Sequence, residues 1–203
     1  MREPIALPFA SLAVRCAELD GDGKIDLVAT GRGSTGELVA VFAGDGAGGF
    51  ELRASEALPG ASGNLVLADI DEDGRRDVVV GQVELLGSEL FLLQNRGAFQ
   101  FEPDSLRVGD GPGTPLVADF DADGHLDLSV LSTGGKLLYS RGDGRGGFVS
   151  VTRRTDDLTV PDLCVACTLA DIDKDGLAEM LMVSPAAPFL WVAENLSQEL
   201  AEP

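Results

Sequence analysis

The chain has 203 residues, of which 44% are hydrophobic and only 5% aromatic, and its formal net charge is −19. This composition is sufficient for an aliphatic core, whereas the excess of acid argues against nucleic-acid binding, which requires clustered lysines and arginines. Three cysteines exclude a disulfide framework. No apolar run is long enough for a transmembrane helix, and the first residues do not resemble a secretory signal peptide.

One acidic pattern of nine residues occurs four times. Residues 119–127 carry aspartates at positions 1, 3, 5 and 9 and a glycine at position 6. The related segments are residues 18–26, 69–77 and 171–179, and we call the four segments windows 1 to 4 in chain order. The windows hold 17 of the 34 acidic residues and start 50–52 residues apart. This period predicts a repeat protein in which each unit needs its neighbours.

Short apolar runs between glycine and aspartate clusters predict strands throughout, and no run has the length and period of a helix. In unit 1 the expected strands are residues 12–19, 25–29, 38–43 and a run that starts at residue 50. In unit 2 they are residues 65–68, 78–80, 90–93 and 99–101, and in unit 3 residues 116–118, 128–131, 136–139 and 148–151. Unit 4 offers residues 163–170, 180–183 and 189–192, and its fourth strand is missing or weak.

The fold class predicted from these elements is all-β, with four repeated units of four strands in a single repeat domain, residues 1–203. The units span about residues 11–60, 61–111, 112–160 and 161–203. Residues 1–10 are expected to complete unit 4, since a first segment that pairs with the last unit leaves no open edge.

A glycine-rich turn precedes the last strand of the units. Residues 44–50 read Gly-Asp-Gly-Ala-Gly-Gly-Phe, residues 142–148 repeat this pattern, and residues 94–99 are a degenerate version. The glycines supply the positive φ angles of a tight hairpin, and the phenylalanine that follows is expected to pack inward.

The windows predict cation sites. Hard cations such as calcium take six to eight oxygen ligands, which carboxylates at positions 1, 3, 5 and 9 and the carbonyl of position 7 would supply. Apart from His125, whose ring is expected to point away from the ion, the windows contain no nitrogen or sulfur ligands, which disfavours zinc and iron. One acidic turn is common without an ion, but four at a fixed period are not explained by turn preferences. The helix–loop–helix calcium motif is excluded because position 12 is never glutamate.

The expected ligands are all window residues. They are Glu18, Asp20, Asp22, Lys24 and Asp26 in window 1; Asp69, Asp71, Asp73, Arg75 and Asp77 in window 2; Asp119, Asp121, Asp123, His125 and Asp127 in window 3; and Asp171, Asp173, Asp175, Leu177 and Glu179 in window 4. Lys24, Arg75, His125 and Leu177 would act through their carbonyls. Up to four calcium ions are expected, and windows 2 and 3, with four aspartates at the ligand positions, should bind best.

The pairing of these windows with the glycine turn of residues 142–148 resembles the FG-GAP or VCBS-type repeat family. The resemblance covers nearly the whole chain and implies β-propeller blades in which the window joins the first two strands and binds calcium. Glu18 and Glu179 depart from the aspartate pattern of the family. Because propellers of the family usually have seven blades, four units imply a small closed ring, part of a larger propeller, or several chains together.

The resemblance and the residues favour a non-catalytic, calcium-stabilised module for binding or adhesion, whose loops contact a protein or carbohydrate partner. Two alternatives remain: an architectural repeat segment of a larger surface protein, or a fragment that multimerises. An enzyme is disfavoured, since the chain has one histidine and no nucleophile motif. By resemblance the protein is expected outside the cell or at its surface, without insertion into the membrane and with homo-oligomers if four units do not close.

Three short motifs are interpreted as incidental. Residues 141–143 read Arg-Gly-Asp, the integrin-recognition tripeptide, but they overlap the glycine turn. Residues 195–197 match an N-glycan acceptor, which matters only in a secreted eukaryotic chain. Cys164 and Cys167 lie on an expected strand at a spacing that places them on opposite faces, so free thiols are favoured over a metal or redox pair.

Overall fold

The structure, a computed structural model, describes residues 7, 9–60, 62–82, 88–109, 114–131, 137–151, 166–184 and 187–193. These residues form strands and connecting turns, and none of them is helical, as the sequence predicts. In this part of the chain no helix meets the length and hydrophobicity that crossing a membrane demands.

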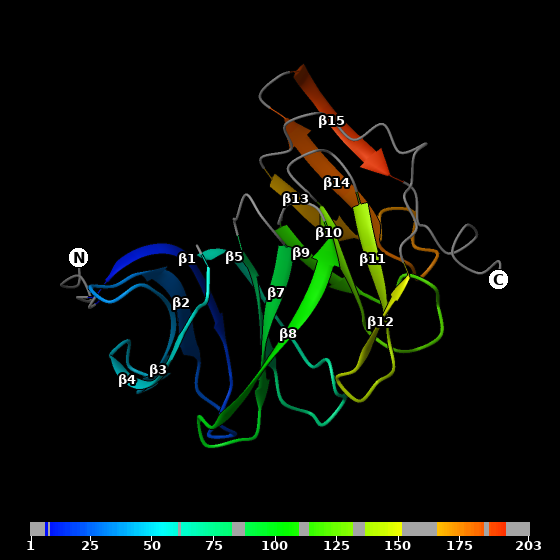
Figure 1. Cartoon of the computed structure of the whole chain (residues 1–203). Coiled ribbons are helices and arrows are strands. Elements are labelled where there is room, and N and C mark those ends of the chain that lie inside the picture. The colour runs from blue at the N-terminus through cyan, green and yellow to red at the C-terminus, as the bar shows by residue number, and fades with distance from the viewer. Residues whose placement is uncertain are drawn as a thin grey trace.

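The strands form four antiparallel sheets, one for each repeat unit, in which neighbours in sequence are neighbours in the sheet (Figure 1). Sheet 1 contains β1 (Ala10–Ala17), β2 (Asp26–Arg32), β3 (Glu37–Gly44) and β4 (Phe50–Ala57). Sheet 2 contains β5 (Ser62–Ala68), β6 (Asp77–Gln82), β7 (Ser88–Asn95) and β8 (Phe101–Gly109). Sheet 3 contains β9 (Thr114–Ala118), β10 (Asp127–Leu131), β11 (Leu137–Gly142) and β12 (Phe148–Val151). Sheet 4, within the described residues, contains β13 (Ala166–Ala170), β14 (Glu179–Ser184) and β15 (Ala187–Ala193).

Consecutive sheets are joined along their first strands. β1 contacts β5, β5 contacts β9, and β9 contacts β13, so the four first strands lie innermost and the later strands of each sheet lie further out. Figure 1 shows the sheets following one another in chain order from blue to orange. Every window connects the first strand of a sheet to the second, which brings all four windows to the same end of their sheets.

The core lies between the sheets, because the strands alternate and bury side chains on both faces. Val28 and Val41 of sheet 1 pack against Val78 and Val80 of sheet 2. On the opposite face of β6, Val79 packs against sheet 3, and sheet 3 in turn packs against Met180 and Met182 of sheet 4. Each unit therefore depends on its neighbour for burial of its apolar face, as expected of a repeat architecture.

The two ends of this array differ. On the outer face of sheet 1, Phe9 packs against Ala29, Ala40 and Phe42, with Leu7 at the border of the cluster. On the outer face of sheet 4, Leu190 and Val192 are 58% and 51% exposed. The described residues thus cover the first end of the array with an aromatic side chain and leave aliphatic side chains exposed at the last end.

The predicted completion of unit 4 by residues 1–10 stays a prediction, because residues 1–6 and 8 lie outside the described part. Leu7 and Phe9, which are described, lie against sheet 1. Of the cysteine pair, Cys167 forms no disulfide and is partly buried against the core between sheets 3 and 4, and Cys164 lies outside the described residues. The glycan acceptor at residues 195–197 also lies outside them.

The degenerate turn of unit 2 has a different register from the one that its sequence predicts. The pattern places Phe99 where units 1 and 3 have Phe50 and Phe148, but β8 begins at Phe101. Arg96 donates its backbone N–H to the carbonyl of Gln100 at 2.8 Å, as Asp45 donates to Gly49 at 3.0 Å. Phe99 consequently occupies a glycine position of the turn, with a φ of 60°. The prediction that β8 begins at Phe99 was wrong, because the backbone hydrogen bond between Arg96 and Gln100, and not the position of the aromatic residue, sets the register of the turn.

Position 4 of the windows is a second place where the backbone requires the left-handed region. Its φ is 56° at Glu72, 60° at Ala122 and 65° at Lys174, whereas window 1 has Gly21 there. Side chains with a Cβ are strained in this region by about 1–2 kcal/mol. Windows 2 to 4 therefore each carry a strained residue that window 1 avoids.

We expect Ala122→Gly to raise the free energy of unfolding by about 0.5–1 kcal/mol, since removal of the Cβ relieves this strain and the added freedom of the unfolded chain offsets only part of the gain. Gly124→Ala is the matched control with the opposite sign, because Gly124 has a φ of 93° and open space around its missing Cβ. Urea denaturation measures both. If both variants changed the free energy of unfolding in the same direction, the assignment of backbone strain to Ala122 would be contradicted.

Candidate metal centre

The carboxylate at window position 9 is the buried anchor of each site. Asp77 is fully buried at the start of β6; its Oδ2 accepts the backbone N–H of Ile70 at 2.9 Å and its Oδ1 that of Asn95 at 2.7 Å. Asp26 bonds Leu19 and Gly44 in the same way, Asp127 bonds Phe120 and Gly142, and Glu179 bonds Ile172. One side chain thus joins the window to the second strand and, in units 1 to 3, to the end of the third strand.

Burial opposes the ionisation of three of these anchors, Asp26, Asp77 and Asp127. Desolvation raises the pKa of Asp77 to about 6, against the lowering effect of its two backbone hydrogen bonds, and the nearby charges of Asp71 and Asp73 raise it further. Burial also raises the pKa of Asp26 and of Asp127. The windows therefore concentrate negative charge around a carboxylate that already lacks hydration, a condition that a bound cation relieves.

The carboxylate at position 1 shapes the loop itself. Asp69 accepts the backbone N–H groups of Asp73 at 3.0 Å and Gly74 at 2.9 Å, and Asp119 makes the same two bonds in window 3. In window 1 the longer Glu18 reaches the N–H of Gly21 instead. The glutamate thus changes the loop hydrogen bonds, in keeping with its departure from the aspartate pattern.

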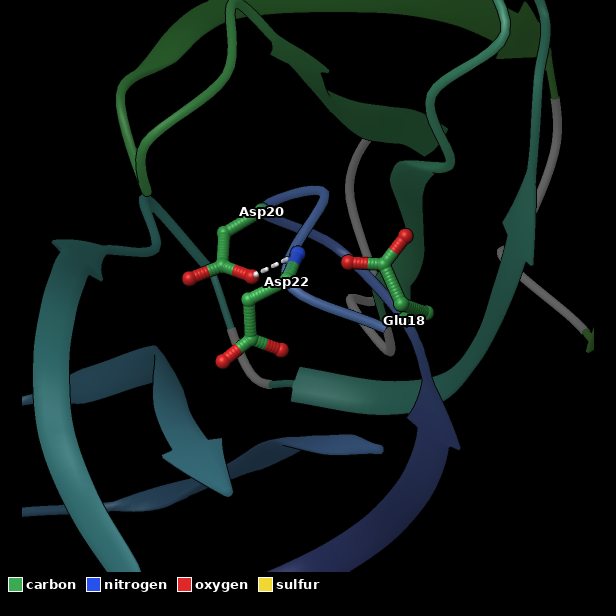
Figure 2. Close-up of side chains that lie close together, drawn as sticks. All are labelled: Glu18, Asp20 and Asp22. Atoms are coloured by element: carbon green, nitrogen blue, oxygen red, sulfur yellow. Dashed lines mark hydrogen bonds between the residues drawn. The ribbon is translucent and has the colours of Figure 1, made fainter. Parts of the chain in front are cut away.

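Three carboxylates converge in every window, with ligand atoms within 4.8 Å of one another. In windows 2 to 4 they belong to positions 1, 3 and 9: Asp69, Asp71 and Asp77; Asp119, Asp121 and Asp127; and Asp171, Asp173 and Glu179. In window 1 they belong to positions 1, 3 and 5, namely Glu18, Asp20 and Asp22 (Figure 2). Asp26 lies outside the group of window 1.

The predicted ligands at positions 5 and 7 behave differently. Asp73, Asp123 and Asp175 lie outside the three-residue groups. In all four windows the position-5 carboxylate accepts the backbone N–H of position 7, at 2.8–2.9 Å. Coordination by the carbonyls of Lys24, Arg75, His125 and Leu177 stays a prediction.

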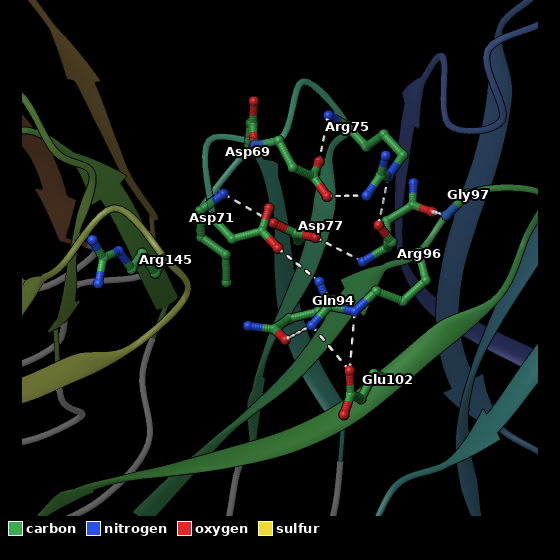
Figure 3. A network of polar contacts seen from close by, with 12 residues as sticks. Asp69, Asp71, Arg75, Asp77, Gln94, Arg96, Gly97, Glu102 and Arg145 are labelled. Carbon is green, nitrogen blue, oxygen red and sulfur yellow. Dashed lines mark hydrogen bonds and ion pairs between the residues drawn. The ribbon is translucent and has the colours of Figure 1, made fainter.

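Window 2 contains a buried oxygen without a hydrogen bond. The side chain of Asp71 is 8% exposed; its Oδ2 pairs with the guanidinium of Arg96 at 2.9 Å, and its Oδ1 has no partner. Figure 3 shows Arg96 lying between Asp71 and Glu102, beside Gln94. A buried polar atom without a partner costs about 1–3 kcal/mol, so native proteins rarely retain one without a use.

This orphaned oxygen indicates that the residues present suit a hard cation. All ligand atoms of the group in window 2 are carboxylate oxygens, which calcium and magnesium prefer. Asp71, whose Oδ1 is an unsatisfied acceptor, is one of these three convergent carboxylates. In the described structure, windows 1 and 3 have no comparable orphan, and there Oδ1 of the position-3 aspartates, Asp20 and Asp121, accepts the backbone N–H of position 5.

Sequence reasoning missed two residues that support the sites. Asn95 is fully buried and donates its Nδ2 to the carbonyl of Leu19 in unit 1 at 2.7 Å and to that of Arg76 at 3.1 Å. Tyr139 donates its hydroxyl to Asp127 Oδ2 at 3.1 Å, and burial raises its pKa. For Asn95 the sequence offers one signal, because this asparagine stands where units 1 and 3 have glycine.

The Arg-Gly-Asp tripeptide is engaged within its own unit. Arg141 pairs with window 3, Gly142 is buried with its N–H on Asp127, and Asp143 accepts the backbone N–H groups of Arg145 and Gly147. These contacts favour the interpretation that the tripeptide is part of the turn.

Comparison with known proteins identifies one family. Its sequence profile, described as FG-GAP-like repeat, matches residues 19–80 and residues 119–182, so the two matches together cover more than half of the chain. The first match contains most of window 1 and all of window 2, and the second contains windows 3 and 4. A search of curated proteins found no match.

We expect Asp77→Ala to lower the free energy of unfolding by about 2–4 kcal/mol, because two buried N–H groups lose their acceptor. Asp77→Asn keeps one acceptor oxygen and should cost less. Asp104→Asn, at an exposed site on β8, is the control and should change stability by less than about 0.5 kcal/mol. Chemical denaturation in calcium-free buffer measures all three, and an alanine variant as stable as the control would contradict the anchoring role.

Proposed function

The chain belongs to the FG-GAP-like repeat family, and on that premise we propose that it is a calcium-stabilised β-propeller module that binds a partner and catalyses no reaction. The observation that carries the calcium assignment is the unpartnered, buried Oδ1 of Asp71 among three convergent carboxylates. Because a group of three carboxylates recurs in each of the four units, we extend the calcium assignment from window 2 to a series of sites.

The role proposed for calcium is structural. In window 2 the ion would be held by Asp69, Asp71 and Asp77 and would supply a positive charge where burial and repulsion oppose ionisation. An ion that binds only the folded loop stabilises it by mass action. Asp77 also fixes the start of β6 to the end of β7, so the ion would strengthen the hairpin and the packing of its unit.

The propeller assignment rests on the arrangement of the sheets. Each sheet is an antiparallel meander, successive sheets pack face to face, and their first strands lie together. The exposed outer face of sheet 4 supports the version in which these four units are part of a larger ring, rather than a closed ring of their own. A further unit packed there would bury Leu190 and Val192.

For the partner we propose a protein or a carbohydrate, met outside the cell or at its surface. A surface cavity of about 770 Å³ lies between unit 1 and the turn of unit 2. It is lined by carboxylates, including Asp20 and Asp45, and by the aromatic rings of Phe50 and Phe99. Hydrogen-bond acceptors beside apolar rings suit a ligand with hydroxyl groups.

The second candidate is an architectural role, in which the array multimerises. The exposed aliphatic face of sheet 4 favours it, since equivalent faces of sheets 1 to 3 are covered by the next unit. Adhesion and architecture are compatible with the same calcium sites, and they differ in whether the protein is a monomer in solution.

We expect calcium at about ten times its dissociation constant to stabilise the wild type by about 1.4 kcal/mol for each site filled, seen as a higher melting temperature that a chelator reverses. Asp71→Asn should lose the share of this rise that window 2 contributes, because it removes one charge from the group of that window. Asp104→Asn is the charge-matched control, and magnesium at the same concentration should stabilise less. An unchanged melting temperature at about 10 mM calcium, with no heat of binding by calorimetry, would overturn the calcium assignment.

Light scattering after size exclusion, with and without calcium, tests the architectural candidate. If the outer face of sheet 4 is an interface, the wild type should run as an oligomer that Leu190→Asp dissociates, because a charge cannot be buried in an apolar contact without a partner. Val149→Asp, at another exposed aliphatic residue on β12, is the control. A wild-type monomer at all concentrations would exclude this role for the chain.

A further inference from the structure

The guanidinium of Arg141 lies in window 3. Its Nε is 2.9 Å from Oδ2 of Asp121, and its Nη2 is 2.6 Å from Oδ2 of Asp123. The two carboxylate side chains are only 9% and 20% exposed, so the pair is shielded from solvent on the carboxylate side. A guanidinium thus bridges positions 3 and 5 of the window, two of the carboxylates predicted as calcium ligands.

Units 1 and 2 lack this arginine. The backbone N–H groups of Gly44, Asn95 and Gly142 all bond the position-9 carboxylate of their own unit, which defines equivalent places on β3, β7 and β11. The preceding residues are Ala43, Gln94 and Arg141. Windows 2 and 3 therefore have the same aspartates at the ligand positions but different residues beside them.

The position-3 aspartates of windows 2 and 3 differ in their hydrogen bonds. In window 2, Asp71 Oδ1 has no hydrogen-bond partner. In window 3, Asp121 Oδ2 meets Arg141, and Asp121 Oδ1 accepts the backbone N–H of Asp123 at 3.2 Å. Each of these aspartates pairs one oxygen with an arginine, Arg96 in window 2 and Arg141 in window 3, and only Asp121 also has a partner for its second oxygen among the described residues.

Arg96 of unit 2 also touches its window, but it is held differently. It contacts Asp71 through Nη1, whereas its Nε and Nη2 lie at 3.0 Å and 2.9 Å from Glu102, which is on β8. Arg96 can therefore leave Asp71 and keep its ion pair with Glu102. Both ion pairs of Arg141 are with window carboxylates, so it has no such second anchor among the described residues.

We infer that Arg141 is an internal counter-ion that occupies window 3 in place of a divalent cation and makes this window a weaker calcium site than window 2. The inference rests on the proposed calcium function. A calcium ion bound by Asp121 must displace the ion pair between Arg141 and Asp121 and then lie close to a positive charge that Asp123 still holds, and both effects lower its affinity. The affinity order of the windows is thus set by a residue outside the window sequence.

Arg141→Gln, which gives unit 3 the residue of unit 2, tests the inference. Calcium titration by calorimetry should show a rise of about tenfold in the affinity of one site, or one additional site, relative to the wild type. Arg145→Gln is the matched control, because it removes the same charge from an exposed residue in the same turn. The gain should also vanish in the double variant Arg141→Gln, Asp121→Asn.

The outcomes separate the two proposals. A wild type that binds no calcium overturns the proposed function itself. A wild type that binds calcium, with Arg141→Gln and Arg145→Gln giving equal affinities, keeps the function and overturns the inference. If Arg141→Gln is too unstable without calcium to titrate, Arg141→Lys replaces it, since lysine cannot bridge two carboxylates with a planar fork. An increase in affinity over the wild type supports the inference, and an unchanged affinity contradicts it.

Discussion

The fold of each unit depends on one buried carboxylate, at position 9 of its window. In units 1 to 3 this side chain receives backbone N–H groups from the start of the window and from the end of the third strand, segments that would otherwise leave buried donors unpaired. The anchoring requires acceptor oxygens in a buried place, and burial raises the pKa of the anchor. The buried carboxylate at position 9 thus both fixes the geometry of the loop and creates the need for a positive charge nearby.

The units meet this need with different groups. Lys24 pairs with Asp22 in window 1, Arg75 and Arg96 with aspartates of window 2, and Arg141 with two aspartates of window 3. These pairs show that a repeat can keep its acidic motif while its surroundings change. Sites of nearly identical sequence then differ in how much of their negative charge is already compensated, which is the quantity that governs cation affinity.

The sequence predicts the period, the strands and the convergence of acidic residues, because all three follow from local patterns. Val28 and Val79 fall on predicted strands, and both are fully buried between sheets. The contacts of Asn95, Arg96 and Arg141 were not predictable, since the register between strands decides which residue reaches the window from 18 to 25 positions away. The strain at Ala122 was hidden for another reason: nothing in an alanine codes for a positive φ.

Asn95 gives the junction of units 1 and 2 a property that no other junction has among the described residues. Asp77 holds the N–H of Asn95, the Nδ2 of Asn95 holds the carbonyl of Leu19, and the N–H of Leu19 is held by Asp26. The anchors of units 1 and 2 are therefore connected by an unbroken series of buried hydrogen bonds. Glycine at the equivalent place in unit 3 has no side chain with which to extend the series. We therefore expect units 1 and 2 to open as one cooperative block, with hydrogen exchange in their two windows coupled.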